Sequence, residues 1–85
     1  MEIEKAFGMV LKLERMQKSF SQEELAHICD LDRTYISMLE RGKRQPSLKT
    51  IFKLSFALNL LASEMLMKVE VKSIVMCKIK IQCLT

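Results

Sequence analysis

Apolar residues recur every three or four positions through most of the chain, and this spacing predicts helices. The expected helices run over residues 4–17, 22–29, 33–41, 48–58 and 62–68. Ser21, Asp32 and Ser47 stand just before the second, third and fourth helices, where a side-chain oxygen can accept a hydrogen bond from a free backbone amide. Glu24, three residues after Ser21, completes a capping box. These signals predict an all-α, five-helix domain over residues 1–68.

The pattern changes after this domain, because from Val69 apolar and polar residues alternate. The apolar residues at odd positions are Val69, Val71, Val75, Cys77, Ile79, Ile81 and Cys83. A period of two predicts a strand-like extension over residues 69–85, either one strand or a hairpin turning near Lys72–Ser73. Three arrangements stay open for it. It pairs with the same strand of a second subunit, lies on the helices, or is disordered.

The second and third helices are joined by only two or three residues around Asp30–Leu31. So short a connection makes two helices cross steeply, at roughly 90–120°, and leaves one of them protruding. The exposed side of the third helix carries Arg33, Thr34, Ser37 and Met38. Arginine can pair with guanine in the major groove, and threonine or an apolar side chain can contact a thymine methyl group. An ordinary solvated face explains these side chains equally well.

Charge is distributed unevenly along the chain, whose formal net charge is +4. Residues 1–40 hold five Lys or Arg against eight Asp or Glu, whereas residues 41–85 hold nine against two. Between Arg41 and Lys53 there are five cations and no acid. Such a local concentration of positive charge suits a polyanion better than the overall charge does, although charged runs are often only solvated surface.

Several other functions lack the residues they need. The three cysteines form no CxxC pair, so neither a zinc site nor a disulfide framework is indicated. His27 is the single histidine and has no Cys or Ser partner at a useful spacing, and no glycine-rich phosphate loop is present. We therefore expect no enzyme, no metal, no cofactor and no small-molecule ligand. No apolar run reaches the ~18 residues of a membrane span, and the acidic N-terminus does not read as a signal peptide. We expect a cytoplasmic location.

The run SQEELAHICDLDRTYISMLERGKRQPSLKTIFKL, residues 21–54, resembles the Cro/phage-repressor (Xre-like) helix-turn-helix family. The similarity extends over about residues 5–70 and implies a lambda-repressor-like domain. Within it, LDRTYIS resembles the controller proteins of restriction–modification systems, although general Xre-like regulators share that run. The resemblance implies a transcriptional regulator that binds double-stranded DNA.

The resemblance also implies roles for individual residues. The base-reading positions are Arg33, Thr34, Ser37 and Met38. The positions that contact the DNA backbone are Gln22, Tyr35, Arg41, Lys43, Arg44 and Ser47. Arg15 and Glu40 match a buried ion pair that is structural. Asp30 stands where the family usually has glycine, and it can adopt the left-handed conformation at modest cost.

One recognition helix covers only ~4–5 base pairs, so we expect a homodimer on a palindromic operator. Its interface would use the fifth helix, with Leu60, Leu61, Met65 and Met67, together with the tail. The alternative is an antitoxin-like or other protein-interaction module built on the same fold.

Overall fold

The computed structural model describes the backbone of residues 3–84 and the side chains of residues 3–78. It contains five helices: α1 Ile3–Gln17, α2 Gln22–Cys29, α3 Arg33–Glu40, α4 Leu48–Ala57 and α5 Ala62–Leu84. The bounds of the first four agree with the sequence prediction to within one residue at either end, so the all-α expectation is confirmed.

Polar side chains begin the middle helices as predicted. The Ser21 hydroxyl accepts a hydrogen bond from the Glu24 amide, and the Glu24 carboxylate accepts one from the Ser21 amide. These two bonds complete the capping box. Asp32 accepts the amide of Thr34 at 2.9 Å, and Ser47 accepts the amide of Thr50 at 3.1 Å. Each cap provides a partner for a backbone N–H that the helix itself leaves free.

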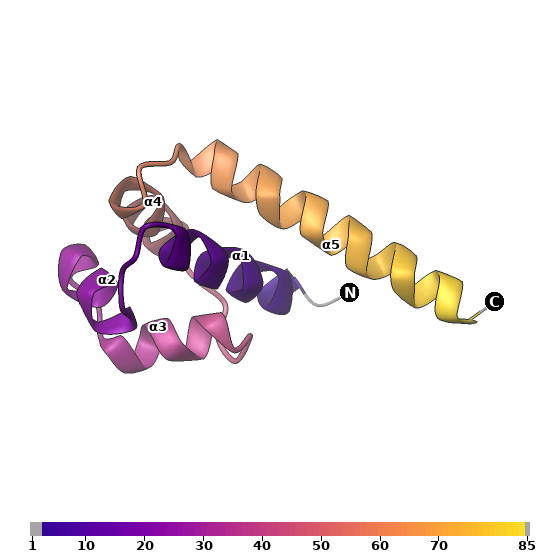
Figure 1. Cartoon of the computed structure of the whole chain (residues 1–85), viewed down its shortest axis with the longest axis horizontal. Helices are drawn as coiled ribbons and strands as arrows, with labels where there is room; N and C mark the ends of the chain where they lie inside the picture. Colours follow the sequence, from indigo (N-terminus) through magenta and orange to yellow (C-terminus); the bar gives the residue numbers. More distant parts are fainter. Residues whose placement is uncertain (1–2, 85) are drawn as a thin grey trace.

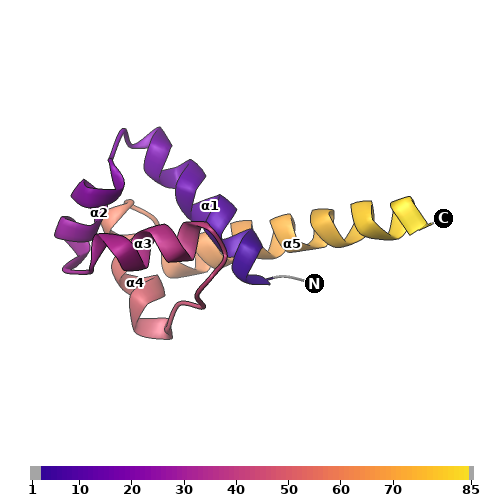
Figure 2. The same ribbon diagram turned by 90° about the horizontal axis from the view of Figure 1, so that it is seen from below.

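The helices enclose one core, with α1 packed against both α3 and α5, and α2 against α3 and α4 (Figure 1). Viewed from below, α3 lies across the front of the body (Figure 2). The fully buried large side chains include Leu11, Leu25, Ile36, Leu39, Leu54, Leu58 and Met65. These residues come from every helix, so the core fixes the position of α3 relative to the rest.

Gly8 allows α1 to approach the end of α3 closely. A Cβ atom at this position would lie 2.5 Å from the backbone oxygens of Leu39 and Glu40. Any side chain at position 8 would therefore push the two helices apart.

The predicted strand-like tail is wrong, because α5 continues as one helix from Ala62 to Leu84. Met65, Val69 and Ser73, which are spaced four residues apart, lie buried on one side of α5, whereas Val71 and Val75 of the alternating set are exposed. Extending an existing helix costs far less than starting a strand that has nothing to pair with. Thr85 and the side chains of residues 79–85 lie outside the described residues.

Helix α5 reaches well beyond the body (Figure 1). Its 23 residues span about 35 Å at 1.5 Å per residue, whereas the molecule measures 45 × 24 × 23 Å. Within the described part of the chain, no helix alone has the length and hydropathy to cross a membrane. The pair formed by α4 and residues 62–78 does meet that test, with a bend of 105° between its members.

Candidate nucleic-acid interface

The turn between α2 and α3 depends on a left-handed residue at Asp30. Its φ of 55° and ψ of 47° end α2, and its amide bonds to the carbonyl of His27 at 3.2 Å. The next amide, of Leu31, donates to the carbonyl of Ala26 at 2.8 Å. The left-handed conformation predicted for Asp30 is confirmed. Because the turn is this tight, α3 leaves α2 at once and its first turns stay uncovered.

The first two turns of α3 present polar side chains on the molecular surface. Arg33 and Thr34 are exposed, and Ser37 is half-exposed. Together with Gln22 from the start of α2, they line a hollow of about 170 Å³. Met38 is half-buried and lies outside that lining. On the opposite side of the helix, Ile36 and Leu39 are fully buried and hold α3 in place.

The carboxylate of Glu40 links α3 to both α1 and α2. Arg15 on α1 binds it with two nitrogens, with Nε 2.6 Å from Oε2 and Nη2 3.1 Å from Oε1. Gln22 donates its amide Nε2 to Oε1 at 3.0 Å. The hydrogen bond to Glu40 raises the pKa of Arg15 against the opposing effect of burial. The ion pair named from the sequence is therefore present, and it also positions the Gln22 side chain, which the sequence did not reveal.

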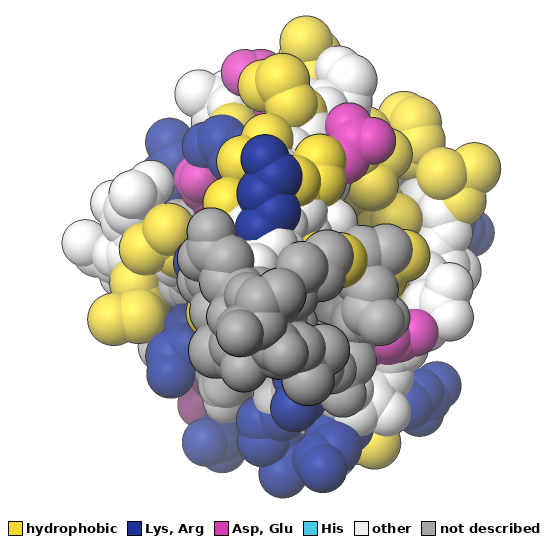
Figure 3. Space-filling view, turned by 90° about the vertical axis from the view of Figure 1, so that its right-hand side faces the viewer, with side chains coloured by type: hydrophobic (Ala, Val, Ile, Leu, Met, Phe, Trp, Pro, Cys, Tyr) yellow, Lys and Arg dark blue, Asp and Glu magenta, His cyan; other side chains and the backbone are white. Residues whose placement is uncertain are grey.

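The loop after α3 carries exposed cations. Arg41, Lys43 and Arg44 are all exposed, and Gly42 makes the turn with a φ of 72°. The guanidinium carbon of Arg44 lies 5.3 Å from the centre of the Tyr35 ring, a distance typical of a cation–π contact. Figure 3 shows Lys and Arg side chains gathered along the lower edge of the molecule, the edge that α3 forms in Figure 1.

The start of α4 adds backbone donors beside this loop. The hydroxyl of Ser47 accepts the Thr50 amide and also lies 2.9 Å from the Thr50 hydroxyl. The Ser47 hydroxyl is therefore already engaged in capping α4. The amides of the first turn, with the positive end of the helix dipole, remain a suitable site for an anion.

The exposed residues named from the sequence thus come from α3 and from the loop that follows it. The hollow, the Glu40 carboxylate and the loop cations all lie along α3 and its two ends. In the described part of the chain, no group of three or more His, Cys, Asp or Glu is arranged to hold a metal ion. Exposed donors and cations on a protruding helix are the chemistry that phosphates and base edges require.

Comparisons with known proteins identify the family of this chain. A family model described as helix-turn-helix matches residues 11–64. The control protein C.BamHI of Bacillus amyloliquefaciens is 49% identical over 61 residues, which are 71% of this chain and 75% of that protein. The solved restriction–modification controller protein C.AhdI of Aeromonas hydrophila is 42% identical, with a TM-score of 0.71 over 73% of this chain and 94% of that one.

A third comparison includes DNA. The controller protein C.Esp1396I was solved as a tetramer in complex with its natural 35 base-pair operator. It is 28% identical to this chain, with a TM-score of 0.76 over 85% of this chain and 95% of that one. The matched proteins are transcription regulators rather than enzymes. The chain belongs to the helix-turn-helix family of Cro/C1-type, DNA-binding transcription regulators.

Proposed function

We propose that this protein binds a two-fold symmetric operator as a homodimer, with the first two turns of α3 in the major groove. Arg33 is the first candidate for a base contact, since a guanidinium can bind both acceptors of a guanine. Thr34 and Ser37 offer hydroxyls beside it, and Met38 can meet a thymine methyl group. The observation that carries this proposal is the exposed hollow shared by Gln22, Arg33, Thr34 and Ser37.

The phosphate contacts surround these base-reading residues. Arg41, Lys43 and Arg44 are exposed beyond the end of α3, and Gln22 lies beside the helix in the lining of the hollow. Tyr35 supports Arg44 through its ring, and Ser47 contributes through its backbone at the start of α4. Phosphate contacts next to the base-reading residues would set the register of α3 in the groove without reading sequence.

An exposed apolar surface on α4 supports the homodimer. Its members are Leu48, Phe52 and Phe56, which recur every four residues, together with Leu61 in the turn to α5. Their exposed fractions range from 59% to 86%. We call this surface the α4 patch. So large a cluster of exposed apolar side chains on a small domain is typical of a protein interface.

The interface expected from the sequence requires correction at Met65, which is fully buried in the domain's own core and cannot meet a second subunit. Leu60 is half-buried, and it lines a hollow together with Phe52, Phe56 and Leu61. Leu61 is 67% exposed and belongs to the α4 patch, so we retain it in the proposed interface. Two copies joined by a two-fold axis through this patch would present two copies of α3 to one DNA duplex.

Selection of bound sequences from random duplexes tests the proposal. We expect an inverted repeat whose half-sites lie about one helical turn apart, and an affinity that falls steeply as salt rises. Sedimentation should give a dimer, and Phe56→Glu should give a monomer with weaker operator binding. Leu13→Glu is the matched control, since Leu13 is 57% exposed on α1, away from the α4 patch. An absence of duplex binding at low salt would favour the protein-interaction alternative.

A further inference from the structure

Helix α5 is apolar on two sides, and only one of them is covered by the protein itself. Met65 and Val69 face the core and are at most 6% exposed. On the outer side, Met67, Val71 and Val75 are 57%, 55% and 44% exposed. An apolar stripe on the solvent side of a helix is typical of a surface that meets a partner. The outer side therefore lacks a partner within the described part of the chain.

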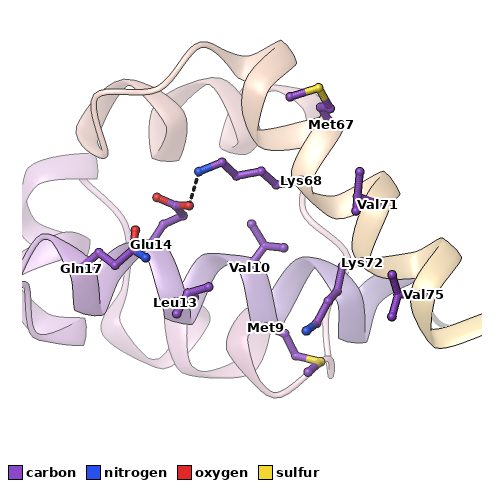
Figure 4. Close-up of a pocket in the computed structure, with 10 residues that line it drawn as sticks. All are labelled: Met9, Val10, Leu13, Glu14, Gln17, Met67, Lys68, Val71, Lys72 and Val75. Atoms are coloured by element: carbon purple, nitrogen blue, oxygen red, sulfur yellow. Dashed lines mark hydrogen bonds and ion pairs between the residues drawn. The ribbon is translucent and has the colours of Figure 1, made fainter. Parts of the chain in front are cut away.

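These outer residues form one wall of a groove between α5 and α1 (Figure 4). The other wall is made by Met9 and Leu13 of α1, which are 46% and 57% exposed. The groove has a volume of about 670 Å³. Along both walls the apolar side chains repeat every four residues, over about 12 Å on α5. That repeat matches the ridges on the surface of an α-helix.

Two lysines of α5 also line the groove. Lys68 reaches across to α1, where its Nζ lies 2.5 Å from Oε1 of the buried Glu14 (Figure 4). Lys72 is half-buried, and no hydrogen bond or ion pair joins its amine to another group in the described part of the chain. Glu14 balances one of these two positive charges. The other remains available to a negatively charged group from outside.

We propose that the groove between α1 and α5 binds a short amphipathic helix of another protein, one that carries acidic residues beside its apolar stripe. The apolar stripe packs between Met9 and Leu13 on one side and Val71 on the other. A carboxylate of the partner pairs with Lys72. This is recognition of a helix in a groove, with anchors at positions i, i+4 and i+7.

Charge and shape distinguish this partner from two others. A second copy of the chain, packed groove against groove, would bring its own unpaired Lys72, so like charges would meet. A small apolar molecule is normally enclosed over most of its surface, whereas these walls are about half exposed to solvent. This surface is also separate from the α4 patch, so the inference does not depend on the proposed dimer.

Two synthetic peptides of about 14 residues test the proposal, each held helical by a cross-link. Both carry leucines at i, i+4 and i+7, one with flanking glutamates and the other with lysines in their place. We expect the acidic peptide to bind the full chain in a calorimetric titration and the basic peptide to bind about tenfold more weakly or not at all. Lys72→Glu should reverse this order. Equal binding of the two peptides, or no binding of either, would overturn the proposal.

A second pair of variants locates the binding site. Val71→Asp should abolish peptide binding, whereas Ile74→Asp should leave it unchanged, because Ile74 is 46% exposed on α5 but outside the groove lining. Circular dichroism confirms that both variants fold. Laurate, a fatty acid, serves as a probe for small amphiphilic ligands. If laurate binds the groove and the acidic peptide does not, the site takes a small amphiphile instead. If Val71→Asp lowers the sedimentation mass, a second copy of the chain occupies the groove. Either result contradicts the proposal.

Discussion

The guanidinium of Arg15 binds both carboxylate oxygens of Glu40, at 2.6 and 3.1 Å. The side chains are 12% and 3% exposed, so neither charge has much access to water. This pair connects the last turn of α1 to the last residue of α3. Because Gln22 bonds to the same carboxylate, the pair also connects the fold to a residue that we place on the DNA backbone.

Removing one member of this pair should destabilise the whole domain. Glu40→Gln leaves the Arg15 charge buried without its counter-charge, and we expect a loss of about 3–5 kcal/mol in the free energy of unfolding. Urea unfolding measures it. Glu23→Gln, at an exposed position on α2, should change stability little. Equal stability of the two variants would show that the pair is not structural. The double variant Arg15→Met with Glu40→Leu should recover part of the loss.

A side chain at position 8 should separate α1 from α3. Gly8→Ala gains about 1 kcal/mol of helix propensity, but its Cβ would lie 2.5 Å from two backbone oxygens that cannot move independently of α3. We expect a net destabilisation of about 1–3 kcal/mol. Lys12→Ala, at an exposed position on the same helix, is the control. A Gly8→Ala variant more stable than the parent would contradict the close approach of the two helices.

The contact between Tyr35 and Arg44 should be detectable as coupling in DNA binding. We expect Tyr35→Leu and Arg44→Ala each to weaken DNA binding. The double variant should lose about 0.5–1 kcal/mol less binding free energy than the two single losses added together. The reason is that the Tyr35 ring positions the Arg44 cation in the free protein. Tyr35→Phe keeps the ring and should keep the coupling. Strictly additive losses would mean that the two residues act separately.

The capping box should make stability depend on pH. The hydrogen bond from the Ser21 amide lowers the pKa of Glu24 below its ordinary value. The folded state therefore holds the Glu24 carboxylate more readily than the unfolded state does. Its contribution is fully present above the ordinary glutamate pKa and is lost as pH falls through the lowered value. Glu24→Gln should flatten this part of the acid unfolding curve, and an identical curve for both proteins would exclude the effect.

Local signals in the sequence were enough to predict α1 to α4 and the turn between α2 and α3. Ser21, Asp32 and Ser47 each mark a helix start by a hydrogen bond over two or three residues, and Asp30 forms its turn through its neighbours. Because these interactions join residues close in the sequence, they can be predicted from residue types at fixed spacings. The resemblance to a known family then named Arg15 and Glu40, which lie 25 positions apart.

Tertiary packing decided what the sequence could not. The alternation after Val69 is compatible with a strand and with a helix, and the packing of α5 on α1 selects the helix. Likewise, apolar residues occupy most of the range 48–58, and only the packed structure shows that Leu54 and Leu58 face the core while Phe52 is 59% exposed. The Gln22 bond to Glu40 links residues whose side chains meet only once α2 and α3 are in place.

Affinity for two duplexes most directly tests the division of the interface into base-reading and phosphate-binding residues. The duplexes are the selected operator and a scrambled version of it, titrated with the parent protein, Arg33→Ala and Lys43→Ala. We predict that Arg33→Ala loses about 1–3 kcal/mol of binding free energy with the operator and little with the scrambled duplex. Its preference for the operator sequence is then smaller. Lys43→Ala should weaken binding to both duplexes equally. It should also reduce the slope of log affinity against log salt concentration by about one. Equal loss of preference in both variants would contradict base reading by α3.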